Sequence, residues 1–111
     1  MDKDQAKNRR SHPRRQAKKS TKIRCQKGIM GMGPNVALTV LDISEAGLCF
    51  TAKADVAKGE EVEIELEGPG TRKPIKRRAS VAWNVALADG NFCLGVRLDK
   101  FLSYAELQSL A

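Results

Sequence analysis

The segment EVEIELE, residues 61–67, restricts the possible fold more than any other part of this chain. Apolar and acidic residues alternate along it, with Val62, Ile64 and Leu66 on one side and four glutamates on the other. Because successive side chains of a strand point to opposite faces, the pattern predicts a strand with one buried and one solvated face. We therefore expect a sheet that covers a core with one face.

Five further segments have the same strand-like character. They are STKIRCQ (20–26), VALTVLDI (36–43), GLCFTA (47–52), IKRRASVAW (75–83) and NFCLGVRLD (91–99). The connections between them are too short for helical crossovers, so the strands are expected to pair antiparallel. Six such strands with one apolar face each close best as a small β-barrel. The alternation places Trp83 on the same face as Val81, and we interpret Trp83 as core or strand-end packing. The alternative is that it lines a ligand or partner surface.

The end of the chain has a helix signature instead. Ser103 fits the N-cap position, with Glu106 as its capping-box partner and Leu102 and Leu107 as a hydrophobic staple. This pattern predicts a short terminal α-helix that runs to about Leu110. Its Leu107 and Leu110 side chains are expected to pack against the barrel.

The positive charge of the chain is concentrated near its N-terminus. Residues 1–24 contain ten Lys and Arg and two acidic residues, a net charge of +8, whereas the remaining 87 residues have a net charge of −1. A length of 111 residues favours one domain. We therefore expect a flexible basic arm over residues 1–17 and the barrel with its helix over residues 18–111. Such an arm attracts phosphates or acidic surfaces.

Several classes of function are disfavoured by what the sequence contains. No segment approaches the roughly 20 apolar residues of a membrane span, and the first residues have no apolar signal region, so a cytoplasmic protein is expected. Cys25, Cys49 and Cys93 are scattered without a C-x-x-C pair, which argues against a disulfide framework and a zinc site. His12 is the single histidine, so a Ser-His-Asp triad cannot be assembled. We expect no catalytic residues and no bound metal, and no enzymatic activity.

A polar turn lies between two of the expected strands, in LDISEAGLCF. Asp42, Ser44 and Gly47 are consistent with an ordinary tight turn, because Asp and Ser bond nearby backbone and glycine permits a positive φ. They are also consistent with a binding edge. A carboxylate and a hydroxyl would then protrude from a rigid barrel, and the glycine would let a planar ligand approach. Asp42 would accept hydrogen bonds from the N–H groups of a guanine Watson–Crick edge.

The second candidate site is the segment RRSHPRR, residues 9–15. Arg10 and Arg14 are four residues apart, and Pro13 disfavours a helix between them. In an extended segment their side chains share one side and their Cα atoms lie up to roughly 13 Å apart. Two guanidinium groups at this spacing can bind a phosphate, the O6/N7 edge of guanine or the plane of a base. The alternative interpretation is a solvated, solubilising tail.

Together the two motifs resemble those of the PilZ domain, a family of bacterial receptors for cyclic di-GMP. The arm has the form R-x-x-x-R at residues 10–14, and D-x-S-x-x-G follows at residues 42–47. The segments ASVAW and FCLGVRLD, with Gly95, also resemble the fifth and sixth strands of that family. The resemblance extends over residues 9–110 and implies a six-stranded antiparallel, split-barrel type of fold.

The resemblance implies that the chain is a receptor or adaptor for cyclic di-GMP, which would be its ligand in place of any cofactor. Arg10 and Arg14 would clamp guanine and phosphate. Asp42 and Ser44 would meet a guanine from the barrel side, and Gly47 would keep the floor of the site clear. Ligand binding would order the arm and switch the interaction with a downstream protein, which the sequence does not identify.

Arg9 precedes the first motif arginine, and in this family an arginine there favours a stacked pair of ligands over a single one. Two alternatives stay open. One is a basic-tailed β-barrel that binds RNA or DNA, although five aromatic residues, mostly on inward faces, offer few stacking platforms. The other is a protein-interaction adaptor that has lost ligand binding, which the intact motif residues disfavour.

Overall fold

The strands form where the sequence alternates, and the mainly β fold with a C-terminal helix is confirmed. A computed structural model of the chain describes residues 13–28 and 33–111. In the strand Glu61–Glu67 the side chains of Val62, Ile64 and Leu66 are fully buried. The four glutamates lie on the opposite face, as the alternation predicts.

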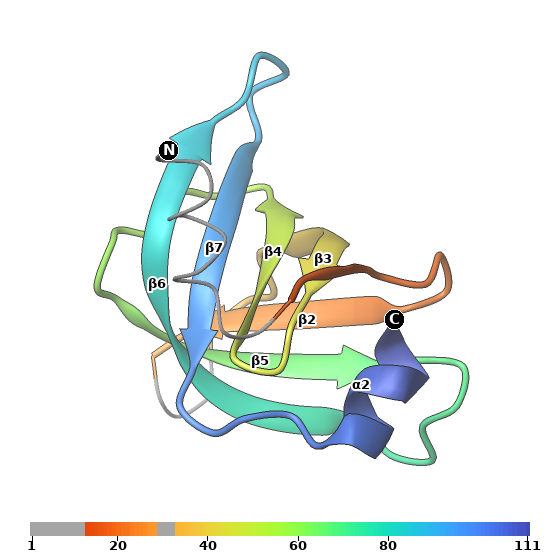
Figure 1. Ribbon diagram of the computed structural model, residues 1–111. Helices are drawn as coiled ribbons and strands as arrows, with labels where there is room; N and C mark the ends of the chain where they lie inside the picture. The colour runs from red at the N-terminus through yellow and green to blue at the C-terminus, as the bar shows by residue number, and fades with distance from the viewer. Residues whose placement is uncertain (1–12, 29–32) are drawn as a thin grey trace, which may run out of the picture.

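Seven antiparallel strands make up one sheet (Figure 1). They are β1 (Arg15–Gln16), β2 (Lys22–Lys27), β3 (Ala37–Ile43), β4 (Gly47–Ala52), β5 (Glu61–Glu67), β6 (Ile75–Ala86) and β7 (Phe92–Leu98). Their order in the sheet is β1-β3-β4-β7-β6-β5-β2. Six of the strands match the six expected ones, and the short β1 is an addition that the sequence does not predict.

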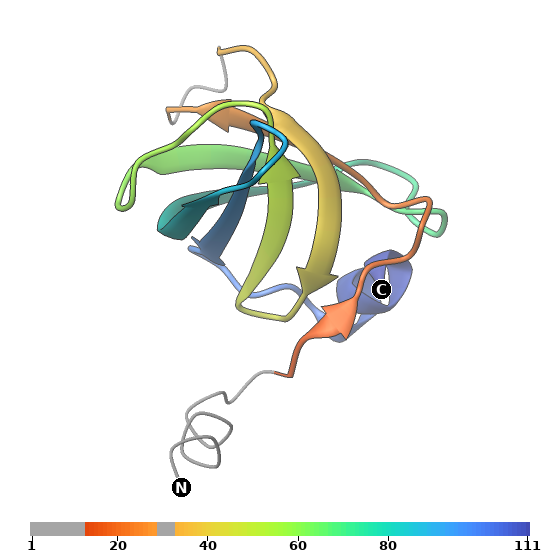
Figure 2. The ribbon, with the colours of Figure 1, turned by 90° about the horizontal axis from the view of Figure 1, so that it is seen from above.

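The sheet curls into a half-barrel around the apolar core (Figure 2). The largest buried side chains of this core include Phe50, Ile43 and Ile64. The curl brings β2 and β3 together at one end, where the N–H of Val36 donates to the carbonyl of Cys25 over 2.9 Å. Towards the other end the two strands separate, so the barrel stays split on this side.

The helix α2 (Tyr104–Leu110) begins as predicted. The Ser103 hydroxyl accepts from the N–H of Glu106 over 3.1 Å, and the Glu106 carboxylate accepts from the N–H of Ser103 over 2.8 Å. This confirms the capping box. Leu102, Leu107 and Leu110 are buried against the core. Within the described ranges, no helix is long and apolar enough to cross a membrane.

A bulge in β6 places Trp83 on the outer face of the sheet. The pairing of β6 with β7 shifts register between Val81, which lies opposite Val96, and Trp83, which lies opposite Gly95. An extra residue in one strand of a pair reverses the faces of the residues that follow. The expected inward position of Trp83 is therefore wrong.

The strand β1 anchors the end of the basic arm beside the polar turn. Arg15 pairs with Ile43 and Gln16 pairs with Asp42, so β1 extends the sheet at the edge of β3. The chain continues along α2, where the N–H of Lys18 donates to the carbonyl of Leu110 over 3.0 Å (Figure 2). The boundary between arm and barrel at residues 17–18 stays a prediction, and most of the arm lies outside the described residues.

Candidate ligand-binding cleft

Ser44 holds the turn between β3 and β4 together. Its N–H donates to the carbonyl of Gly47 over 2.8 Å, and its hydroxyl donates to the same carbonyl over 3.2 Å. The hydroxyl oxygen also accepts from the N–H groups of Ala46 and Gly47, over 3.3 and 3.2 Å. The residue is buried. Ser44 thus fixes the shape of the turn, which agrees with the first of its two interpretations.

Gly47 is required by the close approach of two strands rather than by an unusual backbone angle. A Cβ atom at this position would overlap the carbonyl oxygen of Val96 in β7. Among the described glycines a positive φ occurs at Gly28, Gly59 and Gly90, so the expectation of a positive φ at Gly47 is wrong. The glycine instead lets the start of β4 lie tightly against β7.

Arg14 and Asp42, one from each sequence motif, form an ion pair. The Nη1 atom of Arg14 lies 3.5 Å from Oδ1 of Asp42, and the side chains are 38% and 31% exposed. An exposed pair of this kind contributes little to folding stability, so both groups are available to exchange partners. The other predicted arm residues, Arg9 and Arg10, lie outside the described residues.

A cleft of about 280 Å³ runs from this turn over the outer face of the sheet. It crosses the beginning of β4 and the end of β7 and reaches the bulge in β6. Its lining residues are Arg14, Ser44, Ala46, Gly47, Leu48, Ala82, Trp83, Gly95, Val96 and Arg97. Asp42 adjoins the cleft through its ion pair with Arg14.

Two further residues line the cleft: Arg97, which sequence reasoning missed, and Trp83, for which a ligand or partner surface was only the alternative interpretation. The indole of Trp83 covers Gly95, where a Cβ atom would overlap the ring. Arg97 lies opposite Gly47 in the pairing of β4 with β7. The one signal in the sequence was the glycine in LGV, because a glycine inside a strand often marks a bulge or a place where another group approaches closely. An indole and two guanidinium groups together suit an anion with a planar ring system.

Comparison with protein families decides the identity of this fold. The family model of the PilZ domain matches residues 8–110. The chain belongs to the PilZ domain family. PilZ domains typically bind cyclic di-GMP and generally act as non-catalytic receptors. Comparison with curated proteins finds no match.

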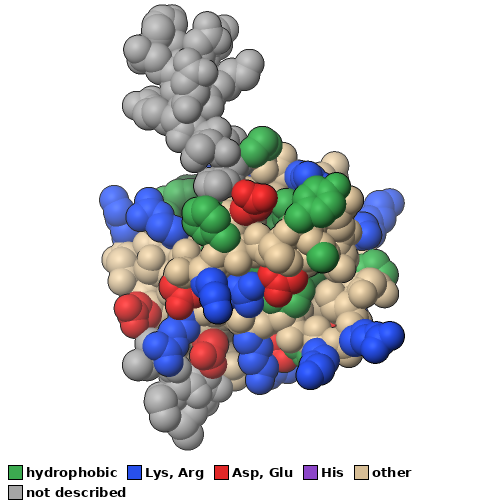
Figure 3. All heavy atoms as spheres, turned by 60° about the horizontal axis from the view of Figure 1, so that its bottom comes forward, with side chains coloured by type: hydrophobic (Ala, Val, Ile, Leu, Met, Phe, Trp, Pro, Cys, Tyr) green, Lys and Arg blue, Asp and Glu red, His purple; other side chains and the backbone are tan. Residues whose placement is uncertain are grey.

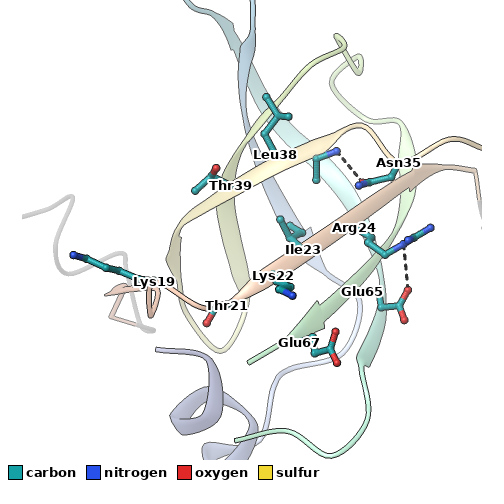
Figure 4. A pocket seen from close by; sticks show the side chains of 11 residues that line it. Lys19, Thr21, Lys22, Ile23, Arg24, Asn35, Leu38, Thr39, Glu65 and Glu67 are labelled. Atoms are coloured by element: carbon teal, nitrogen blue, oxygen red, sulfur yellow. Dashed lines mark hydrogen bonds and ion pairs between the residues drawn. The ribbon is translucent and has the colours of Figure 1, made fainter. Parts of the chain in front are cut away.

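A larger hollow of this PilZ domain lies away from the predicted site residues. It is a groove of about 500 Å³ between β2 and β3, where the two strands separate (Figure 4). Basic Lys19, Lys22 and Arg24 share it with Glu65 and Glu67. An ion pair of 3.7 Å joins the Nε of Arg24 to Glu65. The groove therefore contains charges of both signs.

The charged surface of the barrel body is similarly mixed. On the face seen in Figure 3, Lys and Arg side chains alternate with Asp and Glu over the described part of the chain. This agrees with the net charge of −1 over residues 25–111. No three His, Cys, Asp or Glu side chains of the described residues are grouped so that they could hold a metal ion.

Proposed function

We propose that this PilZ domain is a cyclic di-GMP receptor that binds its ligand between the basic arm and the outer-face cleft. The observation that carries the proposal is the cleft itself, which unites Arg14, the 42–47 turn, Trp83 and Arg97 on one face. Cyclic di-GMP has two phosphates and two guanines, so it offers both the charge and the planar rings that such a surface recognises. The usual ligand of the family supports the same assignment.

The two motifs have complementary roles in this proposal. Arg10 and Arg14 clamp a guanine edge and a phosphate, because guanidinium groups bind both in a bidentate manner. Asp42 accepts hydrogen bonds from the N–H groups of a guanine. The ion pair between Arg14 and Asp42 opens as the ligand takes over both partners. Ser44 fixes the shape of the turn, and Gly47 leaves the bottom of the cleft free of a side chain.

Trp83 and Arg97 complete the far side of the site. The half-exposed indole offers a plane on which a guanine can stack, and base–aromatic stacking contributes about 1–3 kcal/mol per base. Arg97 projects from the neighbouring strand and adds a second guanidinium group to the cleft. In this arrangement one guanine lies near Asp42 and the phosphates lie between the arginines.

Arg9 sets how many ligands are bound. It adds a third guanidinium group to the arm, next to Arg10, and this group contacts a second cyclic di-GMP stacked on the first. We therefore expect two ligands per chain. A stoichiometry of one would contradict this role of Arg9 and leave the clamp by Arg10 and Arg14 unaffected.

Ligand binding switches the arm. The end of the arm is fixed by the pairing of β1 with β3 beside Asp42, so the residues before Arg14 start from the rim of the cleft. A ligand that pairs with Arg10 and Arg14 orders this segment over the barrel. The ordered arm and the covered cleft form a new surface for a downstream protein, as in other order–disorder switches.

Isothermal titration calorimetry with cyclic di-GMP tests the proposal, with GMP and cyclic di-AMP as controls. We expect saturable binding of cyclic di-GMP and at least a tenfold preference over both controls, because the guanine contacts and the cyclic diphosphate are both needed. Equal binding of all three compounds, with affinity that falls steeply with salt, would instead indicate the general binding of nucleic acids.

A further inference from the structure

Two thiols face each other on the outer surface of the sheet, close to the cleft. The Sγ atoms of Cys49 in β4 and Cys93 in β7 are 3.4 Å apart. Both residues share a face with Gly47, Gly95 and Arg97, because the pairing of β4 with β7 places Cys49 opposite Gly95. The third cysteine, Cys25, is buried in the core on the inner face of β2. The chain thus has one thiol pair and one separate thiol.

Cys49, one member of the pair, has a neighbour from the proposed site on each side. Cys49 is opposite Asp42 in the pairing of β3 with β4, and opposite Gly95, which Trp83 covers, in the pairing of β4 with β7. Burial above all, together with the hydrogen bond shared with Cys93 and the charge of Asp42, raises the pKa of the Cys49 thiol to about 12. Cys49 is therefore protonated at neutral pH. It is also buried, whereas Cys93 is half-buried and more accessible to solvent. An oxidant reaches Cys93 first.

We propose that Cys49 and Cys93 are a site of oxidative modification, whose conversion to a disulfide weakens the binding of cyclic di-GMP in the adjacent cleft. The first part of this inference stands on the geometry of the two thiols alone. The second part, the effect on binding, rests on the proposed function.

The oxidant is a low-molecular-weight disulfide, and the reaction is thiol–disulfide exchange. The thiolate of Cys93 attacks one sulfur of the small disulfide and releases its other half as a thiol. Cys49 then loses its proton as it attacks the sulfur of Cys93 in this mixed disulfide, and the second half leaves as a thiol. Two electrons and two protons pass from the protein to the small molecule, and one S–S bond replaces another.

The effect on binding follows from the position of the two cysteines in the ladder. Cys93 lies opposite Thr51, so Cys49 and Cys93 are diagonal neighbours. The Cα atoms of diagonal neighbours are about 7–8 Å apart, whereas a disulfide usually spans about 4.4–6.8 Å. Closing the bond therefore draws β4 towards β7. This movement displaces Asp42 and Gly95, which are the neighbours of Cys49 on its two sides.

The first experiment measures the modification without any ligand. The reduced protein is equilibrated with oxidised glutathione, denatured, alkylated and weighed by mass spectrometry. We expect the number of alkylated thiols to fall from the three of the sequence to one, with Cys49 and Cys93 linked in the peptide map. The same linkage is expected in Cys25→Ser. Retained glutathione on a single cysteine, or a disulfide between two chains, would overturn the proposed site.

The second experiment compares the binding of cyclic di-GMP by the reduced and the oxidised protein in calorimetry. We expect about a fivefold or larger loss of affinity on oxidation, the lower end of typical couplings between sites, with full recovery after treatment with dithiothreitol. Cys93→Ser is the matched control, which is expected to bind equally well before and after glutathione treatment.

The outcomes separate the two proposals. If the disulfide forms and the affinity is unchanged, the coupling is refuted and the receptor function stands. If the reduced protein fails to bind cyclic di-GMP, the receptor function and the coupling are both refuted. The number of alkylated thiols in the first experiment then decides whether the modification site exists. Circular dichroism of each variant verifies that the barrel is folded.

Discussion

The two hollows of this PilZ domain, the groove between β2 and β3 and the outer-face cleft, differ in charge as well as in size. The groove between β2 and β3, at about 500 Å³, is larger than the outer-face cleft of about 280 Å³. Yet its basic side chains are accompanied by Glu65 and Glu67. The described residues that line the cleft include Arg14 and Arg97 and no acidic side chain. One carboxylate, that of Asp42, lies at the rim of the cleft in an ion pair with Arg14, whereas the two carboxylates of the groove are part of its lining. A doubly negative ligand therefore meets less repulsion in the cleft, although the cleft is smaller.

The hollows also differ in rigidity. The groove lies where β2, an end strand of the curled sheet, separates from β3, which is next to the other end strand, β1. The floor of the cleft is the continuous ladder of β4, β7 and β6. Sites that are built on paired strands keep their geometry before the ligand arrives, which reduces the entropy cost of binding. We therefore infer that the cleft is better preorganised for a ligand than the groove is.

The largest effect is expected from Gly47→Ala, because the added methyl group meets the carbonyl of Val96 and the backbone must move. We expect a loss of about 3 kcal/mol in the free energy of unfolding, measured by urea denaturation, as for severe overpacking. The matched control is Gly33→Ala, where the nearest atoms to an added Cβ are backbone atoms of Lys27, 3.7 Å away. Equal stability of the two variants would show that the cleft floor is not tightly packed.

Arg14→Ala tests the charge of the cleft directly. Loss of a charge-assisted hydrogen bond costs about 1.5–3 kcal/mol, so the affinity for cyclic di-GMP is expected to fall at least tenfold while the barrel stays folded. Arg10→Ala is expected to have the same effect. Arg24→Ala removes an arginine of the groove, one that pairs with Glu65, and should leave the affinity unchanged. A similar loss in all three variants would mean that general positive charge drives binding.

Trp83→Ala tests the aromatic wall of the cleft. Loss of one stacking contact costs about 1–3 kcal/mol, so the affinity for cyclic di-GMP is expected to fall roughly fivefold to 150-fold. Val85→Ala is a suitable control, because this side chain is exposed on the same strand and does not line the cleft. Quenching of the Trp83 fluorescence on titration, with no other tryptophan in the chain, reports the contact independently. Unchanged fluorescence at saturation would argue against stacking.

The face of the sheet on which Trp83 lies could not be predicted from the sequence. The strict alternation of residues 61–67 predicts the core side of the sheet correctly, because each inward side chain is apolar and each outward one is acidic. In IKRRASVAW the same rule gives the wrong face for Trp83, because the register shift after Val81 depends on pairing with β7. A bulge is a property of two strands and leaves no periodic trace in one of them.

The site residues divide in a similar way. The spacing of the D-x-S-x-x-G motif indicates the turn, and its hydrogen bonds at Ser44 agree with the known preferences of serine. The sequence does not reveal that Gly47 is required by the carbonyl of Val96, since that contact joins strands distant in the chain. It also gives no hint of Arg97 or of the thiol pair, because both depend on the register of β4 against β7.

The smallest effect is expected at α2, none of whose residues lines the cleft. The Glu106 carboxylate accepts a hydrogen bond from Nη2 of Arg77 over 2.7 Å. Burial alone would raise the pKa of Glu106, but the hydrogen bond from the Ser103 N–H and the charge of Arg77 together lower it. Glu106→Gln keeps an acceptor for the capping box and removes the charge, so we expect a loss of about 1 kcal/mol in the free energy of unfolding at pH 7.

The difference in unfolding free energy between wild type and Glu106→Gln is expected to depend on pH in one direction. A group whose pKa is lower in the folded than in the unfolded protein stabilises the fold above its unfolded pKa, and this contribution is lost as the pH falls through its folded pKa. Urea denaturation of wild type and Glu106→Gln should therefore give a gap at pH 7 that narrows as the solution becomes acidic. The affinity for cyclic di-GMP should be the same in both, because the helix closes the core and leaves the cleft untouched. A difference in unfolding free energy that stays constant down to strongly acidic pH would mean that the substitution acts through packing. A weaker affinity of Glu106→Gln for cyclic di-GMP would mean that α2 and the cleft are coupled through β1, which lies between them.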